Sequence, residues 1–139
     1  MVEIITEKTA EFETAEFKRY ATREVVWCDF HERDVTMHPE FIGRHPAIVV
    51  SKNNRSSRPL LVVPVTSLAQ DDEDECCHKL SKNYWKSDRA ESWAISSHVY
   101  AVSHLRVSRA FKYSKKVTQK DYKAVLTGLT KRLPFSVVF

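Results

Sequence analysis

The stretch Gly43–Ser67, GRHPAIVVSKNNRSSRPLLVVPVTS, decides the fold. Two short runs within it, Ala47–Ser51 and Leu60–Val65, are rich in Val, Ile and Leu. Short β-branched runs of this kind are typical of buried strands. The connector between them, KNNRSSR, has the composition of a turn or loop. The stretch therefore predicts an antiparallel hairpin with a long loop.

The residues that suggest chemistry lie at the ends of this hairpin. Arg44 and His45 precede the first run, and Thr66 and Ser67 follow the second. Antiparallel pairing brings the start of one strand beside the end of the other. A cation, an imidazole and two hydroxyls that meet at one rim would form a phosphate site.

Composition limits the classes of protein that this chain can be. The 139 residues fit one globular domain, with 42% hydrophobic and 11% aromatic residues. The net charge of +4 favours a polyanion or an acidic peptide as partner. Three cysteines, two of them adjacent, do not form a disulfide framework, so we expect reduced thiols and a cytoplasmic protein. We expect no membrane span and no signal peptide.

The N-terminal third predicts a helix, a strand and a loop. Residues 9–21 show helical spacing of Phe12, Phe17 and Tyr20. Arg23–Phe30, REVVWCDF, alternates like a strand, and its Cys28 is expected to be a buried apolar residue and not a nucleophile. His31–Ile42 is then a polar loop.

The second half predicts further strands and one helix. We expect strands at His78–Leu80 and within Glu91–Val107. Ser97 and His98 interrupt the second of these patterns, and they would either donate hydrogen bonds to a ligand or form a polar strand end. His104 is expected to be exposed. Phe111–Val117 is predicted as a basic, aromatic strand, suited to an RNA backbone or to a solvated edge. Thr118–Leu133 predicts a helix that Thr118 caps, followed by an apolar tail.

Two groups of His and Cys residues resemble metal sites, and one acidic run resembles a regulatory segment. The pair His31 and His38, and the run Cys76-Cys77-His78, lack recognised ligand spacing, so we expect no metal and no cofactor. The acidic run Asp71–Glu75 is typical of a solvated loop, although a loop that covers the basic site in cis stays open. Short strands with one closing helix predict a mainly β fold, a small SH3-like or OB-like barrel.

Four pieces of this sequence resemble the PemK/MazF family of toxin endoribonucleases. They are REVVWCDF (Arg23–Phe30), PEFIGRHPAIVVS (Pro39–Ser51), LLVVPVTS (Leu60–Ser67) and SSHVYAVSHLRV (Ser96–Val107). The resemblance implies a homodimeric SH3-like barrel with a C-terminal helix. The resemblance covers a barrel domain over residues 23–134, and we expect an added N-terminal helical extension over 1–22 and a tail over 135–139. It also implies metal-independent cleavage of single-stranded RNA, such as mRNA, by attack of a ribose 2′-OH, and a cognate antitoxin as partner.

The resemblance also implies roles for individual residues. In the family, an Arg directly before a Pro and a Thr in a P-[IV]-T-S piece serve the reaction. Thr66 matches the second position, and Ser67 is its neighbour. The first position is occupied by His45, with Arg44 one residue earlier, so either side chain would fill the role. Histidine donates and accepts protons near neutral pH, and Arg44 would then clamp phosphate. The residues expected to bind substrate around these three are Ser67, Arg55, Arg58, Ser97 and His98.

Two other functions stay open on the same fold. The exchange of Arg44 and His45 relative to the family pattern would fit a non-catalytic protein that binds RNA or another protein. A toxin that poisons gyrase would use the same kind of barrel.

Overall fold

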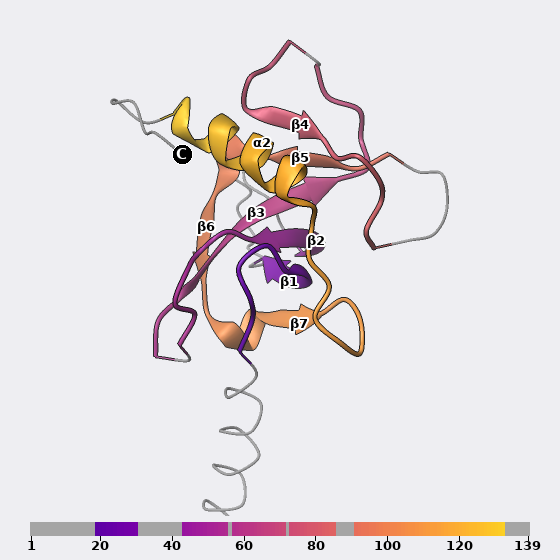
Figure 1. Ribbon diagram of the computed structural model, residues 1–139. Coiled ribbons are helices and arrows are strands. Elements are labelled where there is room, and N and C mark those ends of the chain that lie inside the picture. Colours follow the sequence, from indigo (N-terminus) through magenta and orange to yellow (C-terminus); the bar gives the residue numbers. More distant parts are fainter. Residues whose placement is uncertain (1–18, 31–42, 56, 72, 86–90, 133–139) are drawn as a thin grey trace, which may run out of the picture.

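The computed structural model describes residues 19–30, 43–55, 57–71, 73–85 and 91–132 (Figure 1). These residues form a seven-stranded antiparallel sheet with one α-helix packed across it. The elements are β1 Val25–Phe30, β2 Gly43–Val49, β3 Leu60–Thr66, β4 Cys77–Lys79, β5 Trp93–Ile95, β6 Tyr100–Val102, β7 Val107–Arg109, the short 3-10 helices η1 Ser96–His98 and η2 His104–Arg106, and α2 Gln119–Thr130. The small β-barrel type expected from the sequence is confirmed.

The predicted hairpin is confirmed as the pair β2–β3. Its ladder pairs Ala47 with Pro64, Ile48 with Val63 and Val49 with Val62. β2 begins at Gly43, four residues earlier than predicted, because its first half pairs with β1 and not with β3. Pro46 and Pro64 lie where the β2–β3 ladder stops, since neither has an N–H to donate.

Strand β3 connects the two halves of the sheet. Its first residues pair with β6 and its last residues, Val65 and Thr66, pair with β5. The path of the sheet is β4-β5-β3-β2-β1-β7, with β6 on the other part of β3. Both faces of β1, β2 and β3 are therefore covered, which explains their nearly continuous runs of Val, Ile and Leu.

The two faces carry two separate hydrophobic clusters. Residues of odd number in β1, such as Val25, face the helix side with Ile48 and Val63. Residues of even number, such as Val26 and Cys28, face the other side with Ala47, Val62 and Val107. The alternation predicted for REVVWCDF is therefore confirmed, and the burial of Cys28 with it.

Helix α2 is capped as its sequence predicts. The Thr118 hydroxyl accepts a hydrogen bond from the Asp121 N–H at 3.2 Å. Val125 is buried in the core, and Tyr122 and Leu126 pack beside it. Gly128 is the point of closest approach to the sheet, because a Cβ there would lie 2.9 Å from the Glu75 carbonyl oxygen and 3.0 Å from Ser96 Oγ.

Gly128→Ala should therefore destabilise the fold, although alanine favours helices by about 1 kcal/mol over glycine. The new methyl group meets backbone and a buried side chain, so we expect a net loss of about 1–2 kcal/mol in the free energy of unfolding. Urea unfolding of Gly128→Ala beside the exposed control Lys123→Ala measures this effect. A Gly128→Ala protein more stable than wild type would show that α2 does not pack this closely.

Arg23 adopts a backbone conformation that glycine favours. Its φ is +75°. Three backbone hydrogen bonds hold the turn: Arg23 N to Val49 O at 2.8 Å, Val49 N to Glu24 O at 3.0 Å and Val117 N to Arg23 O at 3.0 Å. The Arg23 Nε also donates to the Val117 carbonyl at 3.1 Å. The turn therefore keeps its geometry without a glycine.

Two substitutions at this position separate strain from hydrogen bonding. Arg23→Ala and Arg23→Gly both lose the guanidinium bond, but only glycine relieves the positive φ. We expect Arg23→Gly to be about 1 kcal/mol more stable than Arg23→Ala in urea unfolding. Equal stability of the two variants would mean that Arg23 is not held in the left-handed region.

Three predictions from the sequence were wrong, and others lie outside the described residues. Phe111–Val117 forms no strand, because it curls back as a loop and pairs only through the bridge between Lys116 and Glu24. His104 is buried, and its Nε2 donates to the Arg58 carbonyl at 2.9 Å. Residues 19–21 are not helical. The rest of the predicted N-terminal helix, the loop 31–42 and the tail after 132 lie outside the described part. No helix of that part is long and apolar enough to cross a bilayer.

Candidate active site

His45 lies in β2 on the face that looks away from α2. It is opposite Cys28 in the β1–β2 ladder, and its ring centroid is 6.2 Å from that of Phe30. Phe30 in turn lies 4.9 Å from the ring of Tyr100 in β6. An imidazole therefore lies at the end of an aromatic row that joins β2, β1 and β6. The alternation of REVVWCDF predicted the burial of Phe30 but not that it would pack against His45.

Thr66 ends β3 at the same end of the hairpin. It is opposite Trp93 of β5, and its Oγ1 accepts a hydrogen bond from the Leu68 N–H at 3.1 Å. This acceptor role fixes the hydroxyl and leaves its hydrogen able to donate to a ligand. Ser67 follows and is exposed. Trp93, a buried residue of the core, thus lies directly beside Thr66.

The strand register places His45 and Thr66 on the same face. Ala47 and Pro64 form the last pair of the β2–β3 ladder. His45 lies two residues before Ala47, and Thr66 lies two residues beyond Pro64. Because side chains alternate along a strand, both point to the side that carries Ala47 and Val62. An imidazole and a hydroxyl therefore flank the place where the two strands part.

Arg44 points to the opposite face. Its guanidinium carbon lies 5.1 Å from the ring centroid of Trp27, and its partner in the β1–β2 ladder is Asp29. Trp27 is only partly buried and packs on the helix-side cluster. The adjacent residues Arg44 and His45 are therefore separated by the sheet, as alternation requires.

Ser97 and His98 form η1, between β5 and β6. The Ser97 hydroxyl and His98 Nδ1 lie 3.0 Å apart at the surface. Tyr100, two residues later, reaches the aromatic row through Phe30. These two polar residues are thus connected to the His45 face through β6.

Arg55 and Arg58 do not join His45 and Thr66 within this chain. They lie in the loop between β2 and β3, at the opposite end of the hairpin (Figure 1). Six steps of about 3.3 Å along a strand put that end roughly 20 Å from Thr66. The loop is held by Asn54, whose Nδ2 donates to the Tyr20 carbonyl at 2.9 Å.

The cysteines show no sign of nucleophilic chemistry. All three are free. Burial raises the pKa of Cys28 to about 12. Burial, followed by the nearby Asp74, raises the pKa of Cys77 to about 11. High thiol pKa values disfavour the reactive thiolate. In the described ranges, no group of three His, Cys, Asp or Glu side chains could hold a metal ion.

A second polar cluster surrounds Asp121 on the helix side. Its carboxylate accepts hydrogen bonds from Tyr84 OH at 2.7 Å and from Ser81 Oγ at 2.6 Å and lies 3.1 Å from His78 Nε2. Asp121 is only 2% exposed. Burial alone would raise the pKa of this carboxyl, but the hydrogen bonds from Ser81, Tyr84 and His78 lower it below the usual aspartate value. The cluster joins the start of α2 to β4 and lies on the other face from His45.

The acidic loop lies beside α2 and not over the predicted basic site. Glu75 Oε1 is 4.0 Å from Lys131 Nζ near the end of α2. Figure 1 shows this loop and the loop that carries Arg55 and Arg58 on opposite sides of the molecule. In the described residues, the acidic run therefore does not cover Arg55 or Arg58.

Comparison with known proteins decides the family. The family model for the PemK-like, MazF-like toxins of type II toxin-antitoxin systems matches residues 21–133. This chain belongs to that family. The resemblance noted in four pieces of sequence thus extends over the whole barrel and α2. No curated protein matches the chain.

Solved structures of toxins share the fold. MazF from Deinococcus radiodurans superposes with a TM-score of 0.64 at 18% identity, over 84% of this chain and 98% of that chain. An endoribonuclease from a mycobacterial species, in complex with its cognate antitoxin, gives a TM-score of 0.59 at 16% identity, over 84% and 98%. A MazE–MazF structure from Deinococcus radiodurans gives 0.57 at 16% identity, over 85% and 98%. At such identities these structures show the fold alone.

Proposed function

We propose that this chain is an endoribonuclease toxin that cleaves single-stranded RNA at the face shared by His45 and Thr66. The observation that carries the proposal is the strand register, which puts an imidazole and a hydroxyl on one face where β2 and β3 part. Family membership and a mycobacterial endoribonuclease with the same fold support the reaction class.

The proposed reaction needs no metal. A ribose 2′-OH loses its proton to His45 as the 2′ oxygen attacks the adjacent phosphorus. The bond from phosphorus to the 5′ oxygen breaks, and that oxygen takes a proton from water. The products are a 2′,3′-cyclic phosphate and a 5′-OH. The Thr66 O–H donates to a phosphoryl oxygen as negative charge develops on it.

The other residues expected from the sequence fill outer positions in this proposal. Ser67, Ser97 and His98 supply hydrogen-bond donors along the same face. Arg44, on the other face, attracts the RNA backbone from the rim. Arg55 and Arg58 would reach RNA that passes the far end of the hairpin, or the site of a second copy in a homodimer.

The partners follow from the same assignment. The solved complexes of a MazF and of a mycobacterial endoribonuclease with antitoxins support an antitoxin that covers the site in this chain as well. Its acidic segment would compete with RNA for the basic surface. We place the toxin in the cytoplasm, where mRNA is found and where three free cysteines stay reduced.

The direct test is cleavage of a mixed-sequence single-stranded RNA by purified protein in EDTA. We expect fragments with 2′,3′-cyclic phosphate ends, and a loss of about 10²-fold or more in rate for Thr66→Ala. Absence of product, or equal product from Thr66→Ala, would count against the proposal.

The position of Arg44 favours one alternative function. Because its guanidinium stacks on Trp27, away from Thr66, the chain would be a non-catalytic RNA-binding member of the family if catalysis requires an arginine at this site. For that alternative we expect the protein to bind RNA with an affinity that falls as the salt concentration rises, and to release no cleaved RNA.

A further inference from the structure

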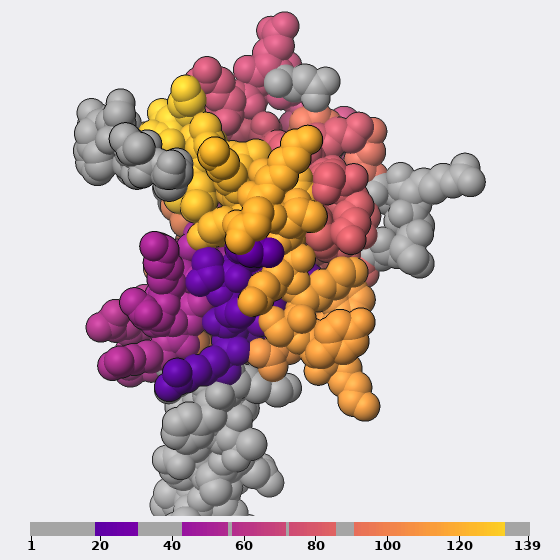
Figure 2. All heavy atoms as spheres, in the orientation of Figure 1, coloured from indigo at the N-terminus to yellow at the C-terminus, as the bar shows by residue number. Residues whose placement is uncertain are grey.

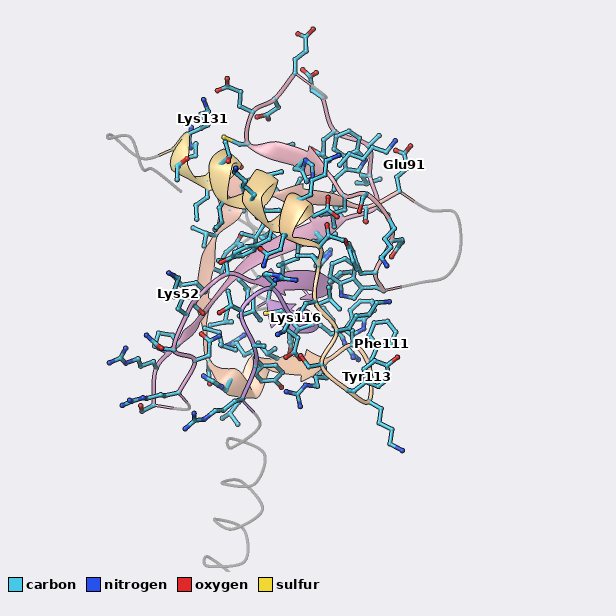
Figure 3. All side chains as sticks on the ribbon, in the orientation of Figure 1. Lys52, Glu91, Phe111, Tyr113, Lys116 and Lys131 are labelled. Carbon is cyan, nitrogen blue, oxygen red and sulfur yellow. The ribbon has the colours of Figure 1, made fainter. Side chains whose placement is uncertain are left out.

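The loop 110–116 carries an exposed aromatic ring among lysines and has no part in the proposed reaction. Tyr113 is 71% exposed. Figure 3 shows Tyr113 and Phe111 close together on one side of the molecule, far from Lys131 and from Lys52. An exposed aromatic ring beside lysines is the combination of groups that binds single-stranded nucleic acid.

The aromatic rings of this side hold cations in place. Lys115 Nζ lies 4.4 Å from the ring centroid of Phe111 and 6.0 Å from that of Tyr84. Lys82 Nζ lies 5.1 Å from the Tyr84 centroid. Arg44 lies over Trp27, which packs on the same hydrophobic cluster as Phe111. We call these residues and Lys112 and Tyr113 the cationic-aromatic face.

The charge of this face is mainly positive. Residues 79–85 and 110–116 contain five lysines and no Asp or Glu, and of the five Lys79 pairs with Glu91 at 2.9 Å. The nearby Glu24 is fully buried and pairs with Arg109, whose Nε lies 2.8 Å from its carboxylate. Asp121 is buried within its own hydrogen bonds. The lysines therefore present a positive surface to a polyanion.

The loop is fixed in place before any ligand binds. The Ser114 hydroxyl donates to Glu24 at 2.9 Å, and the Val25 N–H donates to the Lys115 carbonyl at 2.8 Å. Lys115 Nζ donates to the Tyr84 carbonyl at 3.3 Å. Figure 2 shows the atoms of this loop projecting from the surface beside residues of the segment near 80. An ordered platform loses little entropy on binding.

We propose that the cationic-aromatic face binds single-stranded RNA outside the cleavage site, with bases stacked on Tyr113 and phosphates held by Lys112, Lys115 and Lys82. Lysines interleaved with aromatic rings bind single strands without sequence preference, through backbone charge and stacking. Arg44 stacks on Trp27 on the helix side of β2, and His45 follows it on the other side. A strand held on this face would reach the site by passing around the end of β2 at Arg44. This inference rests on the proposed function for the identity of its ligand.

The test uses the full chain with Thr66→Ala, so that RNA stays intact. Binding of a fluorescein-labelled 20-nucleotide oligouridine is measured by anisotropy at several salt concentrations. We expect Tyr113→Ala to weaken binding about tenfold, as loss of one stacked base does. Lys112→Gln should weaken binding about threefold. It should also reduce the slope of log affinity against log salt concentration by about the amount that one phosphate contact contributes. Lys131→Gln, far from the face, is the matched control and should change nothing.

The outcomes separate this inference from the proposed function and from a protein ligand. Unchanged affinity in both Tyr113→Ala and Lys112→Gln would overturn the inference. A second result would also overturn it: a poly-glutamate peptide and RNA both bind in a way that depends on Lys112 but not on Tyr113. Base stacking would then have no role in binding. If no RNA is ever cleaved but Tyr113 and Lys112 still govern binding, the face stands and the nuclease assignment fails.

Discussion

His45→Ala should lower the rate of RNA cleavage by about 10²- to 10⁴-fold, the range expected when a proton-transfer group is lost. The reason is its place in β2, on the side that Thr66 shares. The variant should fold normally, because His45 is only partly buried and lies at the strand end. Single-turnover cleavage of a labelled RNA, with circular dichroism as the check on folding, measures the effect.

Arg44→Ala provides the matched control one residue away. Its side chain lies over Trp27 on the opposite face, so we expect less than about a tenfold loss, mostly in KM, since a rim cation steers binding more than chemistry. If Arg44→Ala abolishes cleavage while His45→Ala leaves it intact, the family's arginine role has stayed with Arg44 and the assignment of His45 is wrong.

Asp121→Ala should cause the largest loss of stability that the structure allows us to predict. Its carboxylate is 2% exposed and accepts from Tyr84, from the Ser81 hydroxyl and from the Ser81 N–H at 3.1 Å. Removal leaves several of these donors unpartnered and loosens the start of α2. We expect a loss of about 3 kcal/mol in the free energy of unfolding. Glu73→Gln, an exposed acid in the nearby loop, should change stability by less than about 0.5 kcal/mol.

The same carboxylate predicts a pH dependence. Its pKa in the folded chain lies below the usual aspartate value of about 3.9, because the hydrogen bonds outweigh burial. Its contribution to stability is therefore complete above about pH 4 and is lost as the pH falls through the lowered pKa. Urea unfolding from pH 7 to pH 3 should show a smaller acid-induced loss in Asp121→Asn than in wild type. An identical acid-induced loss in both proteins would mean that Asp121 has an ordinary pKa.

The strands and the last helix could be predicted because their signals are local. Alternation in REVVWCDF, the Val-rich runs of the hairpin and the cap at Thr118 each act within one element. Phe111–Val117 was predicted as a basic strand with aromatic residues. The structure instead uses Phe111 to pack on the core and Ser114 to bond Glu24, and neither contact is visible in a linear pattern.

The candidate site was less predictable than the fold. Sequence could bring Arg44, His45 and Thr66 to one end of a hairpin, but only the register decides which of the adjacent pair faces Thr66. His104 was expected at the surface, because the residues around it in the sequence do not indicate that its ring bonds to the distant carbonyl of Arg58. Arg55 and Arg58 were placed near the site for their charge, whereas the length of the strands separates them from it.

A double-mutant cycle on cleavage tests most directly whether His45 and Thr66 act on one phosphodiester. The rates of wild type, His45→Ala, Thr66→Ala and the double variant are measured on one RNA in EDTA. Groups that act as a unit are strongly non-additive, so the double variant should be within about tenfold of the slower single variant. A double variant whose loss equals the product of the two single losses would show that the two side chains act independently, and the shared site would be refuted.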